Sequence, residues 1–246
     1  MKLHNILTCK EEEPLQGKAD LVVVTDTAYT PGVVAKAVDT LRPFSDIHPS
    51  LLQAGCDARE SFAQGMQAAK AYELRGSYLI LCSNIKTDMA AVIKTLPDLG
   101  YDESTTELNN FEKLDRLSEP MLLFCAGFLV EATRRFHVVL AGEEEMAACL
   151  LIADIIREDV LMRLNSQNLT LAMTEETLKA KETQIKKMLA RLSYTPHALY
   201  TDLSMDSLHV KLPKTGEEAG ALYYAAANNI ADQRLFDEIE VTFYML

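Results

Sequence analysis

Short apolar runs alternate along this chain with longer stretches in which apolar residues recur every three or four positions. The run LVVVT at 21–25 is rich in valine, which is typical of a buried parallel strand. The next stretch places Val33, Ala37 and Leu41 on one face of a helix, and Pro43 marks its end. Because such β-then-α units repeat, we predict an α/β fold of three layers, with a mostly parallel, Rossmann-like sheet and helices on both faces.

The predicted strands are 21–25, 77–82, 137–141 and 168–173, and 197–203 is a further strand or an extended segment. Helices are predicted at 30–44, 56–74, 118–136, 143–159 and 174–192, and one or two more follow from 216 onward. The range 84–101 is predicted to hold a loop, a helix and a Pro-Asp-Leu-Gly exit. Asp57 is a candidate N-cap, and Ser118 is another, with Pro120 in the first turn after it. A single domain spanning 1–246 is expected, with a core at about 20–230, an N-terminal extension at 1–19 and a C-terminal helix or tail at 231–246.

Composition narrows the classes of function. The 246 residues carry a formal net charge of −12 and 48% are hydrophobic, so the chain can bury a large core but repels nucleic-acid phosphates. No stretch is long and apolar enough to predict a membrane span, and no signal-peptide apolar run is seen. The five cysteines show no C-x-x-C spacing, which argues against a zinc site or a disulfide framework. We therefore expect a cytoplasmic protein that needs no metal and no cofactor.

Ligands of open parallel sheets bind at the carboxyl ends of the strands. This rule selects the loops that follow Thr25, Cys82, Ala141 and Met173. The first of these loops offers the oxygens of Asp26, Thr27 and Thr30. We favour Thr30 as a helix cap with Pro31 at the first helical position, and a role in ligand binding is the alternative.

The second loop holds the densest polar cluster at any predicted strand end: Ser83, Asn84, Lys86, Thr87 and Asp88. Lys86 could meet a phosphate, and Thr87 could donate a hydrogen bond to one at a helix start. Alternatively, Thr87 or Asp88 caps the helix and Lys86 is simply solvated. Both interpretations stay open on the sequence alone.

The third loop has Gly142 followed by Glu143, Glu144 and Glu145. Carboxylates in the first turn of a helix are favoured by the helix dipole by about 0.3–1 kcal/mol, so the pattern needs no ligand. A bound cation or a ribose hydroxyl is the functional alternative.

A fourth glycine-rich segment lies before the last helices. Gly216 and Gly220 bracket Glu217 and Glu218, and a carboxylate placed there could act as a general base. A glycine-rich helix start with acidic first-turn residues is the structural alternative.

Taken in order, several segments resemble the nicotinate-nucleotide:dimethylbenzimidazole phosphoribosyltransferases, in particular their archaeal-type branch. They are QAGCDARESFAQGMQAAKAYEL, YLILCSNIKTDMAAVIKTLPDLGYD, HVVLAGEEEMAACLLIA, TPHALYTDLSMDS and GEEAGALYYAA. These enzymes move phosphoribose from nicotinate mononucleotide to 5,6-dimethylbenzimidazole during synthesis of the cobalamin lower ligand. The order and spacing of the segments carry the resemblance.

The resemblance implies that Glu217 is the general base, or Glu218 if the match shifts by one. It also implies a homodimer whose partners are a small nucleotide and an aromatic base, and it makes the apolar helix at 121–130 a candidate buried element. The residues that would line the nucleotide site are Ser83, Asn84, Thr87, Gly142, Gly216 and Gly220.

The chain departs from the family at both glycine-rich loops. Glu143, Glu144 and Glu145 stand where a glycine and polar neighbours are expected, and Thr87 alone persists from a Gly-Gly-Thr-Thr loop. Ser83 replaces an acidic residue. Lost glycines remove close N–H donors and added carboxylates oppose a phosphate. A catalytically impaired nucleotide-binding, base-binding or regulatory homologue is therefore the second hypothesis, and an unrelated small-molecule enzyme is the third.

Overall fold

The computed structural model describes residues 1–53, 56–96, 110–116, 119–160, 164–205, 208–210, 212 and 216–245. Its strands are β1 (Leu3–Asn5), β2 (Ala19–Thr25), β3 (Asp46–Leu51), β4 (Tyr78–Ser83), β5 (Val138–Ala141), β6 (Leu169–Thr174) and β7 (His197–Thr201). Its helices are α1 (Val33–Leu41), α2 (Ala58–Ala71), α3 (Met89–Thr95), α4 (Asn110–Asp115), α5 (Pro120–Ala132), α6 (Glu144–Val160), α7 (Glu175–Leu189), α8 (Glu218–Ala227) and α9 (Asp232–Met245), and Ser166–Asn168 forms a 3-10 turn.

The strands form one seven-stranded sheet in the order β1-β7-β6-β5-β4-β2-β3. All neighbouring strands run parallel except β1, which pairs antiparallel with β7. The chain winds from β2 to β3 toward one edge, and from β4 through β5 and β6 to β7 toward the other, so the direction of winding reverses between β2 and β4. In open α/β sheets the crevice at such a reversal is the usual ligand site.

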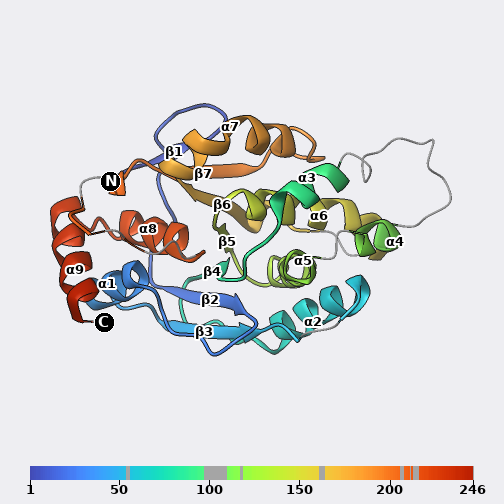
Figure 1. Cartoon of the computed structure of the whole chain (residues 1–246), viewed down its shortest axis with the longest axis horizontal. Coiled ribbons are helices and arrows are strands. Elements are labelled where there is room, and N and C mark those ends of the chain that lie inside the picture. The colour runs from blue at the N-terminus through green and yellow to red at the C-terminus, as the bar shows by residue number, and fades with distance from the viewer. Residues whose placement is uncertain are drawn as a thin grey trace.

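Alternate residues of each strand enter two separate hydrophobic clusters, one on each side of the sheet. Val22 and Leu79 pack with α2, α5, α6 and α7, whereas Val23 and Ile80 pack with α1, α8 and α9. Figure 1 shows this arrangement, with α1, α8 and α9 on one side of the sheet and α2, α5 and α6 on the other. The single three-layer α/β domain with a mostly parallel sheet is therefore confirmed.

The hydrophobic pattern located β2, β4, β5, β6 and β7, and it missed both edge strands. β3 carries Asp46, His48 and Pro49, so it lacks the continuous apolar run of an inner strand. Proline is tolerated there because an edge strand has a ladder on one side only. β1 is three residues long and lies within the segment that we expected to be an extension, yet it closes the opposite edge of the sheet.

The apolar helix predicted at 121–130 is α5, and residues 121–132 of it are all buried. It crosses α2 at two glycines. A Cβ atom on Gly65 would lie 1.9 Å from the carbonyl oxygen of Phe124, and one on Gly127 would lie 2.0 Å from that of Phe62. The two backbones can approach this closely only because neither glycine has a side chain.

The predicted caps at Asp57 and Thr30 have different outcomes. Asp57 caps α2 as predicted and forms a capping box with Glu60. The cap predicted at Thr30 is wrong, because α1 begins at Val33 after Gly32 and has no side-chain cap from its own segment. The N–H of Gly32 is bound instead by the distant Glu217 carboxylate. Ser118 lies outside the described residues.

Candidate functional site

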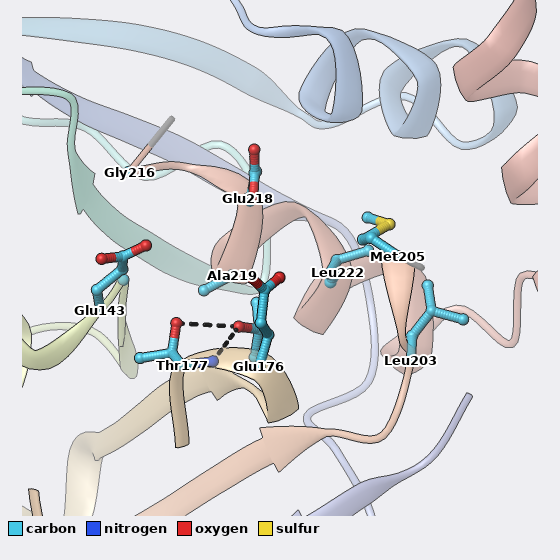
Figure 2. A pocket seen from close by; sticks show the side chains of 11 residues that line it. Glu143, Glu176, Thr177, Leu203, Met205, Gly216, Glu218, Ala219 and Leu222 are labelled. Carbon is cyan, nitrogen blue, oxygen red and sulfur yellow. Dashed lines mark hydrogen bonds between the residues drawn. The ribbon is translucent and has the colours of Figure 1, made fainter. Parts of the chain in front are cut away.

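A recess opens at the carboxyl ends of β5 and β6, where the loops after these strands meet the start of α8. Figure 2 shows Glu143 from the loop before α6, Thr177 from α7, and Glu218 and Ala219 from α8 around it. Its lining residues are Gly142, Glu143, Thr174, Glu176, Thr177, Leu203, Met205, Gly216, Glu218, Ala219 and Leu222. The free volume is about 20 Å³, enough for one water molecule, whereas sites for drug-sized ligands span roughly 300–1,000 Å³. A nucleotide would need this recess to widen.

Glu217 does not line the recess. It stands at the N-cap of α8 and only 1% of it is exposed, because it turns under the loop that follows β2. The hydroxyl of Tyr29 donates a hydrogen bond to Oε2 at 2.7 Å, and the backbone N–H of Gly32 donates to Oε1. Burial raises the pKa of the Glu217 carboxyl, and the two hydrogen bonds oppose that rise. Both carboxylate oxygens are thus occupied by donors of the chain itself.

Gly216 and Gly220 allow α8 to sit close to the sheet. A Cβ atom on Gly216 would lie 1.5 Å from the carbonyl oxygen of Ser83, and one on Gly220 would lie 2.7 Å from Cγ2 of Ile80. Gly216 also reaches the recess, whereas Gly220 is enclosed between β4 and β5. Ser83 is buried, donates to the carbonyl oxygen of Val24 at 3.3 Å, and accepts from the N–H of Ile85 at 3.1 Å.

The residues of the polar loop after β4 differ in exposure and in hydrogen bonding. Asp88 caps α3 by accepting from two backbone N–H groups, which decides between the two predicted caps. Asn84 and Lys86 are exposed. Thr87 is half-buried, and its Oγ1 is buried with no hydrogen-bond partner among the described residues. The Cα atom of Asn84 would lie 3.6 Å from a Cβ atom on Gly216, which lines the recess.

The three glutamates after Gly142 have three different environments. Glu143 is exposed, whereas Glu144 is buried and pairs with Nζ of Lys181 at 3.2 Å. Glu145 folds back, so that its Oε1 accepts the N–H of Glu143 at 3.0 Å. Burial, together with the charges of its two acidic neighbours, raises the pKa of Glu145 to about 7.

Two contributions to the site escaped the sequence analysis. Thr174 and Thr177 line the recess, and Thr174 also caps α7 by accepting the N–H of Thr177 at 3.1 Å. The strand-end rule signalled this loop but not its individual residues. Tyr29 left no signal, because no local pattern links it to a glutamate 188 positions later. Within the described part of the chain, no group of three or more metal-ligating side chains could hold an ion, and no helix could cross a membrane.

Comparisons with solved structures bear on the fold. A crystal structure of CobT from Thermus thermophilus matches with a TM-score of 0.50 at 14% identity, over 91% of this chain and 84% of that one. A crystal structure of the nicotinate-nucleotide-dimethylbenzimidazole phosphoribosyltransferase from the same organism also matches at 14% identity, over 94% and 84%, with a TM-score of 0.49. This chain has the CobT fold. No family model and no curated protein matches the sequence.

Proposed function

We propose that this protein is a phosphoribosyltransferase that moves phosphoribose from nicotinate mononucleotide to a benzimidazole-type base in cobalamin lower-ligand synthesis. The observation that carries the proposal is the placement of Glu217. A carboxylate whose pKa is raised by burial stands at the carboxyl edge of the sheet, immediately after a glycine pressed against the end of β4. A base in such a position can accept the N–H proton that the benzimidazole loses when its other ring nitrogen bonds to C1 of the ribose and nicotinate leaves. The shared CobT fold supports the same assignment.

In this proposal Glu217 is the general base. The nucleotide lies over the ends of β4 and β5, against Ser83, Asn84, Thr87, Gly142, Gly216 and Gly220. Gly142 and Gly216 support it most directly, since both line the recess. Gly220 contributes through the close approach of α8 to the sheet. We also propose that the protein works as a cytoplasmic homodimer.

A second candidate function is a nucleotide-binding, base-binding or regulatory homologue with impaired catalysis. The hydrogen bonds of the loop after β5 favour it. The N–H of Gly142 donates to the carbonyl oxygen of Ala172, and that of Glu143 donates to Glu145. Neither group is therefore available to a phosphate in this structure, and a phosphate bound here would face the Glu143 carboxylate.

The deciding experiment mixes purified protein with nicotinate mononucleotide and 5,6-dimethylbenzimidazole and detects α-ribazole phosphate by mass spectrometry. We expect product from the wild type and none from Glu217→Gln. The exposed Glu73, which follows α2, provides a matched control, and Glu73→Gln should keep full turnover. Absence of product would refute the enzyme, and thermal stabilisation by either compound in that case would leave the second candidate.

A further inference from the structure

The two hydrogen bonds at Glu217 differ in how easily they can be released. The donor to Oε1 is the main-chain N–H of Gly32 at the start of α1, which is held in place by the helix. The donor to Oε2 is a side chain, Tyr29, on a short loop whose neighbours at 26–28 and 30 are exposed. Oε2 is therefore the oxygen that a ligand can reach, and only after Tyr29 has moved.

The Tyr29 side chain, which donates a hydrogen bond to Oε2 of Glu217, is chemically similar to an acceptor base. Proton transfer to Glu217 requires an aromatic N–H within about 3 Å of a carboxylate oxygen. Tyr29 presents an aromatic ring with one protic O–H, at 2.7 Å from Oε2. Burial raises the pKa of Tyr29 far above its ordinary range, so the phenol stays protonated and remains a donor.

We propose that Tyr29 plugs the acceptor position: its phenol occupies the hydrogen-bonding place of the aromatic base at Glu217, and the base binds only when Tyr29 swings away. This inference rests on the proposed function, because it takes Glu217 as the group that receives the acceptor. The Tyr29 ring packs against the hydrophobic cluster beneath α1 and α8. Its departure leaves a ring-sized apolar space with a carboxylate at one end, which is the environment that a neutral benzimidazole requires.

The plug lowers the apparent affinity for the base, because only the fraction of molecules with Tyr29 displaced can bind it. Truncating the side chain removes this competition. We expect the Kd of benzimidazole, measured by isothermal titration calorimetry, to fall by about tenfold or more in Tyr29→Ala relative to the wild type. Tyr29→Phe loses the hydrogen bond to Oε2 but keeps the ring, so its Kd should lie between those of the wild type and Tyr29→Ala. Tyr244→Ala removes a tyrosine that is 76% exposed on α9 and serves as the matched control.

Adding Glu217→Leu, which removes both acceptor oxygens, to Tyr29→Ala identifies where the ligand binds. The gained affinity should disappear in the double variant if the base contacts Oε2. Circular dichroism checks that each variant folds. Tyr29→Leu, which removes the phenol but keeps an apolar side chain over the same cluster, replaces Tyr29→Ala in both titrations if the alanine variant unfolds.

The outcomes separate this inference from the proposed function. Tighter binding in Tyr29→Ala that depends on Glu217 supports the plug even if no variant forms α-ribazole phosphate, in which case the enzymatic proposal alone fails. Equal benzimidazole affinity in wild type and Tyr29→Ala overturns the plug, and product formed by the wild type would then leave the enzyme standing. Gained affinity that persists in the double variant also overturns the plug.

Discussion

Replacing Glu145 by glutamine should make the protein more stable at neutral pH. A free glutamate titrates near 4.5, whereas the native Glu145 has a pKa of about 7, so the folded protein holds this proton over a wider range than the unfolded chain. Because the native state binds more protons between these values, the wild type loses stability as pH rises from 4.5 to 7. The native and unfolded pKa values differ by about 2.5. At about 1.36 kcal/mol per pKa unit, this difference lowers the free energy of unfolding by about 3 kcal/mol once both states are ionised.

Urea denaturation of wild type and Glu145→Gln, followed by circular dichroism from about pH 4.5 to 8, measures this effect. The glutamine carbonyl can still accept the N–H of Glu143, so the change removes the charge and little else. The difference in unfolding free energy should be near zero at the acid end and should reach about 3 kcal/mol in favour of the variant at about pH 8. Other carboxylates titrate in both proteins and cancel in the difference, and Glu73→Gln provides a control. A difference that does not change with pH would refute the reasoning.

Three packing predictions can be checked by urea denaturation as well. Gly127→Ala puts a methyl group 2.0 Å from a carbonyl oxygen of α2, so α5 must shift, and the free energy of unfolding should fall by about 1–3 kcal/mol. Gly216→Ala meets the carbonyl oxygen of Ser83 at 1.5 Å and should cost at least as much, with a lower Tm as the second readout. Tyr72→Phe removes the 2.8 Å hydrogen bond to buried Asp20 and should cost about 1–2 kcal/mol, less than the alanine changes because two backbone N–H groups still bind that carboxylate.

The inner strands were predictable because each is buried on both faces, and a buried parallel strand must be continuously apolar. That requirement does not apply at an edge. β3 exposes His48, Pro49 and Leu51, and β1 is held in the sheet by pairing with β7, about 200 positions away. Neither strand has a local hydrophobic pattern that distinguishes it from a loop.

The same contrast holds at the candidate site. The strand-end rule selected the loops that line the recess, because topology alone places them at one edge of the sheet. The start of α1, by contrast, could not be predicted from the sequence. Local preference pointed to Thr30 as its cap, but the Glu217 carboxylate, 185 residues from Gly32, binds the N–H there. A tertiary contact of this kind leaves no trace in the spacing of nearby residues.

The acidic turn after β5 begins helix α6, and its buried carboxylates have partners within the protein. Glu144 has a lysine partner from α7, Glu145 binds the N–H of Glu143, and acidic groups at this helix end are favoured by the dipole. A phosphate-binding loop needs the opposite, namely free N–H groups and no nearby negative charge. The Glu145 carboxylate therefore accepts an N–H that a phosphate could otherwise bind. If the recess widens to admit a nucleotide, its phosphate must find donors away from this turn, and the exposed loop after β4 offers Asn84 and Lys86.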